Sequence, residues 1–237
     1  MKISFISPFC NLLKEFTSIS ILDKANQKGI VQYDFFDLFS FSDDPNNRID
    51  DHPYGGGDGM LLTAQPIYSA YDEILKKSSS KKTRVIYPTP DGSMLSTEIA
   101  EDLSIEANLV FVCGHYKGID QRVRDDIVTD EISIGDYILT GGELPACVIA
   151  DSIIRLIPGV LNSIESAKTD SFYDGLLDSP YYTRPKEYRE SKVPDILMSG
   201  NHKKIEEWKM NERVKKTKIK RPDLYKKYMQ HKNQKVE

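Results

Sequence analysis

Cysteine and histidine are scarce in this sequence, and their spacing excludes several classes of site. The three cysteines, Cys10, Cys113 and Cys147, are odd in number, lie far apart and include no C-x-x-C pair. This argues against a disulfide framework and against a zinc site, and it fits the reducing environment of the cytoplasm. The four histidines show no metal-ligand spacing either. We therefore expect a cytoplasmic protein without a structural metal.

Long apolar runs are also missing. No segment approaches the roughly 18 consecutive apolar residues of a transmembrane helix, and the run at the N-terminus is too short and too interrupted for a signal peptide. Hydrophobic residues make up 39% and charged residues 29% of the 237 residues, which is typical of globular proteins with a substantial core. We expect no membrane partner, and either one domain with an appendage or two modest domains.

Charge is unevenly distributed along the chain. The net charge is −4, but residues 183–237 carry 17 Lys and Arg against 8 Asp and Glu, a net charge of +9. Residues 1–182 carry 15 basic and 28 acidic groups, a net charge of −13. A basic C-terminal region favours a polyanionic partner, and the interleaved aromatics Trp208, Tyr225 and Tyr228 favour nucleic acid. The alternative is an ordinary solvated helical surface.

Segments that suit strands alternate with segments that suit helices. The run LVFVCG, residues 109–114, is continuously apolar, as in strands buried on both faces of a parallel sheet. Asp91-Gly92 predicts a turn, and residues 134–139 predict the end of a further strand. The alternation predicts an α/β fold with a parallel sheet covered by helices, followed by basic helices towards the C-terminus. Strands are predicted at 3–7, 30–37, 84–88 and 109–114, and helices at 11–28, 66–77, 96–108, 121–126 and 144–157.

Two glycine-rich loops lie near predicted strand ends, where open α/β sheets bind ligands. They are PYGGGDGM at 53–60 and TGGELP at 140–145. Glycine lets another group approach the backbone closely because it has no Cβ atom. Neither loop has the G-x-x-x-x-G-K-[ST] pattern of phosphate-binding loops or the G-x-G-x-x-G pattern of a Rossmann fold. From spacing alone, each is either a tight turn or a cradle for a mononucleotide or adenosine-type ligand held by backbone groups.

Five motifs together resemble the bacterial tRNA (guanine-N1)-methyltransferase family. They are IDDHPYGGGDGM at 49–60, VCGHYKGID at 112–120, SIGDYILTGGELP at 133–145, RLIPGVL at 155–161 and TDSFYDGLLDSPYYTRP at 169–185. They occur in the family's order and span nearly the whole chain. The resemblance implies a homodimeric enzyme that methylates N1 of guanosine 37, directly 3′ of the anticodon in tRNA. It also implies the SPOUT fold, whose parallel sheet contains a deep trefoil knot, an exception to the rule that chains do not thread loops.

The resemblance also implies a division of the chain. Residues 1–160 correspond to the SPOUT methyltransferase domain, with the cofactor-binding knot at about 84–160. Residues 161–175 correspond to an interdomain linker, and residues 176–237 to a small, basic, helical tRNA-binding domain. The implied cofactor is S-adenosyl-L-methionine, bound in the knot. The implied cofactor-binding residues are Tyr87, Pro88, Gly114, Tyr116, Ile134, Gly135, Asp136, Tyr137, Ile138, Leu139, Gly141, Gly142 and Pro145.

Catalytic and substrate-binding residues follow from the same resemblance. Asp170 matches the base that takes the N1 proton, and Arg155 matches the cation that stabilises charge at O6. Taken alone, Asp170 also suits a helix cap or turn, and Arg155 also suits an i,i+4 ion pair with Asp151. A backbone loop with a carboxylate can read the edge of a flipped-out guanine. The implied guanine-binding residues are Asp50, Tyr54, Gly55, Gly56, Gly57 and Gly59.

Two positions depart from the family's pattern. Lys117 stands where the family usually has a glutamate tied to magnesium dependence, and Pro88 replaces a more usual aliphatic residue and removes a backbone N–H. The charge reversal at Lys117 argues against a magnesium contact there and predicts an altered response to magnesium. Two alternative functions are ribose 2′-O-methylation by another SPOUT enzyme and RNA binding without catalysis. A nucleotide-hydrolysing enzyme fits less well, since the sequence has no magnesium–phosphate motif.

Overall fold

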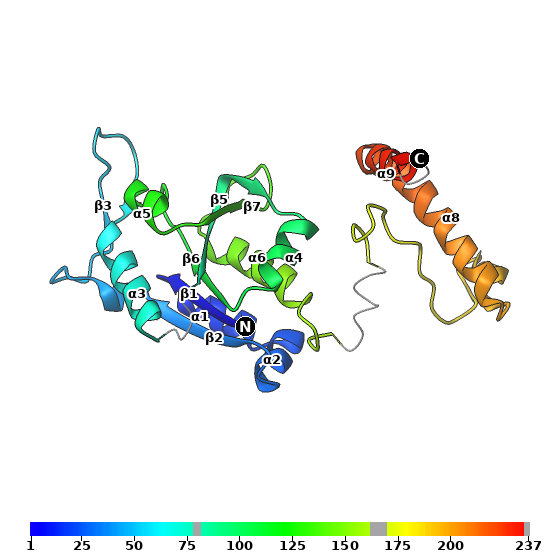
Figure 1. Ribbon diagram of the computed structural model, residues 1–237, viewed down its shortest axis with the longest axis horizontal. Helices are drawn as coiled ribbons and strands as arrows, with labels where there is room; N and C mark the ends of the chain where they lie inside the picture. Colours follow the sequence, from blue (N-terminus) through cyan, green and yellow to red (C-terminus); the bar gives the residue numbers. More distant parts are fainter. Residues whose placement is uncertain (78–81, 162–169, 235–237) are drawn as a thin grey trace. The chain divides into compact units, whose positions relative to one another are not determined.

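The computed structural model describes residues 1–77, 82–161 and 170–234. The chain divides into two compact units, an N-terminal unit, Met1–Asn162, and a C-terminal unit, Ser163–Glu237. The N-terminal unit contains a sheet with helices on both faces, whereas the C-terminal unit is mainly helical (Figure 1).

The N-terminal unit is built on a five-stranded sheet in which all neighbouring strands are parallel. The strand order is β2-β1-β6-β5-β7, so β6 lies at the centre (Figure 1). Parallel neighbours need long crossover connections, which the helices supply. The predicted α/β fold with a parallel sheet is confirmed. The strands are β1 (Lys2–Ser7), β2 (Gln32–Asp37), β5 (Arg84–Met94), β6 (Asn108–Val112) and β7 (Asp130–Ser133).

Helices cover both faces of the sheet because the side chains of β6 alternate between two apolar layers. Leu109 and Phe111 join the layer that includes α1, α4 and α6, whereas Val110 and Val112 join the layer that includes α3 and α5. Phe111 also stacks on Phe5 of β1, with ring centroids 5.2 Å apart. The central strand is thus buried on both faces, as its apolar run predicts. The helices are α1 (Cys10–Thr17), α2 (Ser20–Gln27), α3 (Ala64–Lys77), α4 (Thr97–Ser104), α5 (Gln121–Asp126) and α6 (Glu143–Ile154).

The prediction of one helix over residues 11–28 is wrong. The segment forms α1 and α2, separated at Ser18 and Ile19. The hydroxyls of Thr17 and Ser18 donate back to carbonyls of the last turn of α1, which competes with continuation of the helix. Ser20 then takes a left-handed backbone conformation, with φ 51°, and redirects the chain.

Two predictions for β5 and β7 are also wrong. The predicted turn at Asp91-Gly92 lies inside β5, which continues to Met94 with a shift in register between Pro88 and Ser93. The predicted strand end at 134–139 is an irregular loop, because β7 already ends at Ser133. The N–H of Gly135 donates to the Ser133 hydroxyl. A continuing strand would instead use that N–H for a backbone hydrogen bond to its neighbour.

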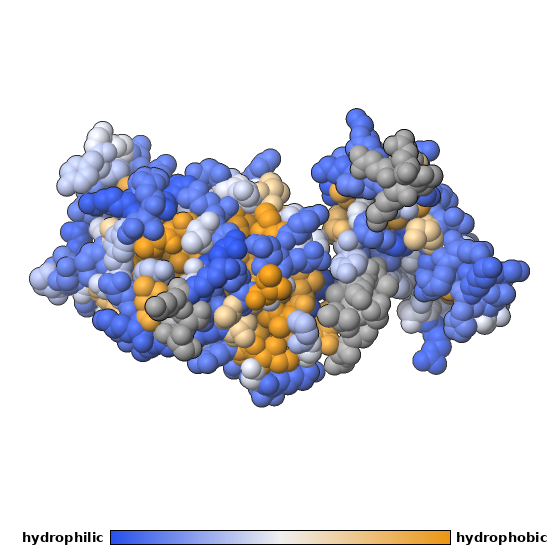
Figure 2. All heavy atoms as spheres, in the orientation of Figure 1, coloured by the Kyte–Doolittle hydropathy of each residue, from blue (hydrophilic) through white to orange (hydrophobic). Residues whose placement is uncertain are grey.

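The C-terminal unit consists mainly of two basic helices, α8 (His202–Lys220) and α9 (Pro222–Gln234), as predicted. A short hairpin of β8 (Glu187–Tyr188) and β9 (Ser191–Lys192) and the 3-10 helix η2 (Asp195–Met198) precede them. Figure 2 shows a mostly hydrophilic surface on this unit. Within the described residues, no helix is long and apolar enough to cross a membrane.

Candidate active site

Several predicted cofactor residues meet at the carboxyl edge of the sheet. Gly114 and Tyr116 follow β6, residues 134–139 follow β7, and Tyr87 lies in β5 just before the shift in register. Tyr87 packs directly on the loop after β6, since a Cβ atom placed on Gly114 would lie 2.9 Å from Cε2 of Tyr87. Open parallel sheets bind their ligands at this edge. The structure therefore brings residues from three separate motifs to one place.

The loop after β6 lies directly against the paired glycines Gly141 and Gly142. The N–H of Gly142 donates to the carbonyl of Gly114 at 2.8 Å, and a Cβ atom on Gly142 would lie 2.6 Å from the backbone nitrogen of Gly114. A Cβ atom on Gly141 would lie 2.3 Å from the imidazole of His115. Glycine at both positions allows the loop after β7 to cross tightly against the loop after β6. Pro145 follows in the first turn of α6 and is buried.

A buried carboxylate fastens this crossing. Glu143, the first residue of α6, is 4% exposed. One carboxylate oxygen lies 2.7 Å from Nε2 of His115, and the other accepts a hydrogen bond from the Ser7 hydroxyl at 2.5 Å. The Ser7 oxygen in turn accepts from the N–H of Phe9 at 2.8 Å. The cluster thus joins the end of β1, the loop after β6 and the start of α6.

This cluster could not be predicted from the sequence. Its members are separated by 28 positions between His115 and Glu143 and by 136 positions between Ser7 and Glu143. The one local signal was an acidic residue in the first turn of an apolar helix, where the helix dipole also favours negative charge. Only the topology of the sheet brings the three side chains together.

Arg124 of α5 braces the irregular part of β5. Its guanidinium donates two hydrogen bonds to Glu131 at 2.7 Å and one to Asp91 at 2.8 Å. It also lies 5.3 Å from the centroid of the Tyr87 ring, in cation–π geometry. Hydrogen bonds from Thr89 and then from Arg124 lower the pKa of Asp91, whereas burial raises the pKa of Tyr87. Arg124 is a second feature that the sequence did not reveal, and it holds a predicted cofactor residue in place.

The loop after β7 presents side chains to solvent. Ile134 packs against the core. Gly135 has φ 151°, and a Cβ atom placed on it would lie 2.3 Å from Cε1 of Tyr137. Exposed apolar side chains that lie together often mark a binding surface. The exposed residues of this loop are Asp136, Tyr137, Ile138, Leu139 and Thr140.

The glycine-rich loop at 53–60 is attached to the loop after β6. It connects β3 (Asp50–Asp51) with β4 (Leu61–Leu62), which form an antiparallel pair. The N–H of Lys117 donates to the carbonyl of Met60, and the N–H of Leu62 donates to the carbonyl of Gly118, both at 3.0 Å. The predicted guanine-binding loop and the predicted cofactor loop are therefore neighbours.

The tip of this loop is open to solvent. Tyr54 is fully exposed. The pKa of the Tyr116 phenol is raised, first by burial and then by the charge of Asp50. The methylene groups of Lys117 pack on Gly59, where a Cβ atom would lie 2.9 Å from Cγ of the lysine. Left-handed backbones with open space around them occur at Gly55, Gly56 and Gly57.

The cysteines do not take part in the candidate site as ligands or nucleophiles. All three are buried and free. Burial is the main cause that raises the pKa of Cys10 to about 11 and that of Cys147 to about 12, so both thiols stay protonated at neutral pH. In the described ranges, no group of three or more potential metal ligands occurs.

The two predicted catalytic residues belong to different units. Arg155 caps the C-terminus of α6 in the N-terminal unit, where its N–H donates to the carbonyl of Asp151 at 3.2 Å. Asp170 lies in the C-terminal unit, at the start of a turn that continues to Gly175.

The chain matches known proteins along nearly its whole length. The family described as tRNA (guanine-1)-methyltransferase TrmD matches residues 1–227. A tRNA (guanine-N(1)-)-methyltransferase of Clostridioides difficile strain 630 is 47% identical over 96% of this chain and 98% of its own length. Proteins of the same name from Bacillus subtilis strain 168 and Listeria monocytogenes EGD-e are 48% and 49% identical, over 95% and 96% of this chain and 93% of each relative. The chain therefore belongs to the tRNA (guanine-1)-methyltransferase family.

Proposed function

We propose that this protein transfers a methyl group from S-adenosylmethionine to N1 of guanosine 37 in tRNA. The family match over residues 1–227 carries the proposal, because relatives at 47–49% identity are named for guanine-N1 methylation of tRNA. The carboxyl edge of the sheet supports it, since the predicted cofactor loop and the predicted guanine loop are hydrogen-bonded to each other there. The proposed substrate also favours the cytoplasm as the compartment.

The residues at this edge suit S-adenosylmethionine. Adenine is read well by backbone N–H and C=O groups, and glycine lets the loops after β6 and β7 bring their backbones together at this edge, at Gly114 and Gly142. Tyr87, Pro88 and Tyr116 would line the site on one side, and the exposed loop 134–139 on the other. When bound, S-adenosylmethionine supplies an electrophilic methyl group carried on a sulfonium ion.

The protein's own residues have three tasks in this reaction. The loop around Tyr54, with Asp50, holds the guanine so that N1 is aligned for methylation. Asp170 accepts the hydrogen of N1, which is weakly acidic, as a general base. Arg155 stabilises the negative charge that develops at O6 as that proton leaves.

The organisation of the chain fits the same reaction. We assign residues 1–160 to the SPOUT methyltransferase domain, 161–175 to a linker and 176–237 to tRNA binding, where α8 and α9 supply cations for phosphates. The tight crossing of Gly142 on Gly114 supports a knotted path for about 84–160. A homodimer is supported by Leu144 and Val148, which are 52% and 46% exposed and four residues apart on α6, whereas the other apolar residues of this helix are buried.

Single-turnover methylation by an Asp170→Asn variant tests the assignment of the base. We expect a rate 10²- to 10⁴-fold below that of the wild type, roughly the contribution of a general base, with an unchanged Kd for S-adenosylmethionine in calorimetry. Asp195→Asn, which changes an exposed acid of the same unit, serves as the control. Equal rates for Asp170→Asn and the wild type would remove Asp170 from the mechanism. Absence of any binding heat in the wild type would instead favour RNA binding without catalysis.

A further inference from the structure

The segment from Asp170 to Ser179 folds back on itself. The Ser171 hydroxyl accepts from the N–H of Asp178 at 2.9 Å, and the N–H of Phe172 donates to the carbonyl of Leu176 at 2.8 Å. Phe172 has φ 82°, a left-handed conformation that a bulky residue adopts only where its surroundings enforce it. The residue directly after Asp170 is therefore part of a closed turn.

This turn is held by one face of α8. Arg213 forms an ion pair with Asp174 at 2.5 Å, and the Thr217 hydroxyl accepts from the N–H of Leu177 at 2.8 Å. Lys216 donates to the carbonyl of Asp178 at 2.8 Å. Residues three and four positions apart lie on the same face of a helix, so these three side chains form one continuous support. Leu176 and Thr217 are fully buried in this contact.

Arg213 is unusual among the basic residues of α8 because it is withdrawn from solvent. Its side chain is 12% exposed, and its Nε has no hydrogen-bond partner among the described residues. A cation in this position is costly unless a carboxylate compensates it. Asp174 supplies that carboxylate, and its own side chain is 40% exposed, so the pair is withdrawn from solvent on the arginine side only.

The charge of Asp170 reaches Tyr181, which follows the turn. The hydrogen bond that Tyr181 donates to Asp178 is the main cause that raises the pKa of Tyr181 to about 12. Burial and the charge of Asp178 contribute next, and Asp170 adds to the shift while Arg213 opposes it. Asp170 and Arg213 therefore both lie within electrostatic range of Tyr181 in the C-terminal unit.

We infer that Arg213, with Thr217 and Lys216, positions Asp170 for proton abstraction by anchoring the 170–179 turn to α8. This inference rests on the proposed function, in which Asp170 is the base. It means that the base is held by the unit that is proposed to bind tRNA, and not by the unit that is proposed to bind the cofactor. Arg213 is a positioning residue, because it acts through Asp170 and not on the substrate.

The test uses Asp174→Asn, which removes the ion pair but keeps every basic residue. The asparagine also keeps the side-chain oxygen that accepts from the N–H of Leu176. Asp223→Asn is a matched control, because it removes the carboxylate partner of Arg221 in an exposed pair at the end of α8. We expect kcat for Asp174→Asn to fall about tenfold, as for a misplaced catalytic group, with Kd for tRNA and for S-adenosylmethionine within about twofold. Asp223→Asn should retain the wild-type kcat.

A double-mutant cycle separates positioning from general loss of structure. In an Asp170→Asn background, Asp174→Asn should change the single-turnover rate by less than about twofold, since both substitutions then act on one group. The same tenfold loss in both backgrounds, or a wild-type kcat for Asp174→Asn, would overturn the inference. If Asp174→Asn lowers the melting temperature strongly, Thr217→Val repeats the cycle with the loss of one hydroxyl. Full activity of Asp170→Asn would identify the proposed function, and not the anchoring of the turn, as the part that failed.

Discussion

Glu143 is the residue on which the crossing at the carboxyl edge depends. Its carboxylate is buried, and its two oxygens have different partners, His115 and Ser7. When a buried carboxylate oxygen loses its hydrogen-bond partner, the cost of desolvating that oxygen is no longer compensated. The hydrogen bond to His115 should therefore stabilise the fold as well as hold the loop that carries Gly114 and Tyr116.

His115→Ala should lower the free energy of unfolding by about 1–3 kcal/mol, because it leaves one oxygen of Glu143 without its partner. Urea denaturation at neutral pH measures this change. His52→Ala is the matched control, since His52 is exposed, and surface substitutions usually stay within about 0.5 kcal/mol. Equal stabilities for the two variants would show that the His115–Glu143 contact contributes nothing.

Lys117 should alter the response of the enzyme to magnesium. Its side chain packs on Gly59, at the junction of the two proposed binding loops, where the family usually has a glutamate. Lys117→Glu reverses the charge there, and a carboxylate binds a hard cation that an ammonium group repels. We expect the variant to show a magnesium titration of methyl transfer different from that of the wild type. Superimposable titrations would contradict the hypothesis.

At this scale the sequence indicated that something approaches the Gly141–Gly142 pair, but not what. The structure shows that His115 and the backbone of Gly114 do. Local spacing contains no information about a partner far away in the chain, so neither the Glu143 cluster nor the brace formed by Arg124 could be predicted. The proposed site residues were identified by resemblance to a family, and that resemblance rests on whole motifs and not on local spacing.

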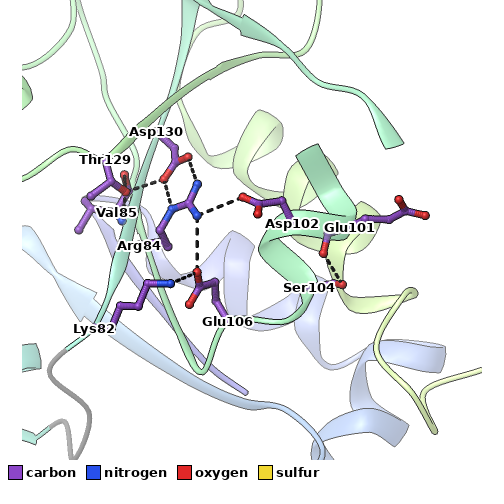
Figure 3. Close-up of polar contacts among 9 residues, drawn as sticks. All are labelled: Lys82, Arg84, Val85, Glu101, Asp102, Ser104, Glu106, Thr129 and Asp130. Carbon is purple, nitrogen blue, oxygen red and sulfur yellow. Dashed lines mark hydrogen bonds and ion pairs between the residues drawn. The ribbon is translucent and has the colours of Figure 1, made fainter. Parts of the chain in front are cut away.

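Among the elements, β5 depends on an ion-pair cluster near its start (Figure 3). Arg84 pairs with Asp130 of β7 at 2.5 Å, with Asp102 of α4 at 3.1 Å and with Glu106 at 3.5 Å. Lys82 also pairs with Glu106, at 2.6 Å. The cluster thus connects β5 to its edge neighbour β7 and to α4, and the side chain of Arg84 is largely buried within it.

Arg84→Met should lower the free energy of unfolding by about 2–3 kcal/mol at pH 7, because it leaves Asp130 largely buried without its cation. Burial opposes ionisation of Asp130, but the hydrogen bonds from Arg84 and Thr129 lower its pKa below 3.8 overall. The stabilisation is therefore present at neutral pH and disappears as pH falls through that lowered pKa. Urea denaturation from pH 7 to pH 3 should show the two proteins converging.

The control for this prediction is Arg122→Met, which breaks an exposed ion pair with Asp120. Such pairs contribute about 0–1 kcal/mol. If Arg84→Met lowers the free energy of unfolding no more than Arg122→Met does, the cluster contributes no more to stability than an exposed ion pair. A difference between Arg84→Met and the wild type that persists unchanged at pH 3 would contradict the role of Asp130.

Elements were predictable from sequence where a strong local signal coincides with burial. The apolar run of β6 and the start of α4, where Ser96 caps the N–H of Ile99, are examples. The break between α1 and α2 was not predictable, because apolar spacing continues through it. The extension of β5 past Gly92 depends on contact with β7, since a Cβ atom on Gly92 would lie 2.4 Å from the backbone of Glu131.

For the whole molecule, the exposed apolar stripe on α6, formed by Leu144 and Val148, predicts self-association. Val148→Asp places a charge on this stripe without disturbing the buried face of the helix. We expect the wild type to sediment as a dimer and Val148→Asp to sediment as a monomer with little methyl transfer, because charge is excluded from the centre of such interfaces. Ile105→Asp, which changes an exposed residue beyond α4, should remain a dimer. A dimeric Val148→Asp would place the interface elsewhere.

The most direct test of the account is methyl transfer to two tRNA transcripts that differ only at position 37, guanosine in one and adenosine in the other. Labelled S-adenosylmethionine supplies the methyl group, and the labelled nucleoside is identified after digestion. We predict label on the guanosine transcript alone, recovered as 1-methylguanosine. Equal label on both transcripts, recovered as a ribose-methylated nucleoside, would contradict the proposed reaction and the roles of Asp170 and the guanine-binding loop.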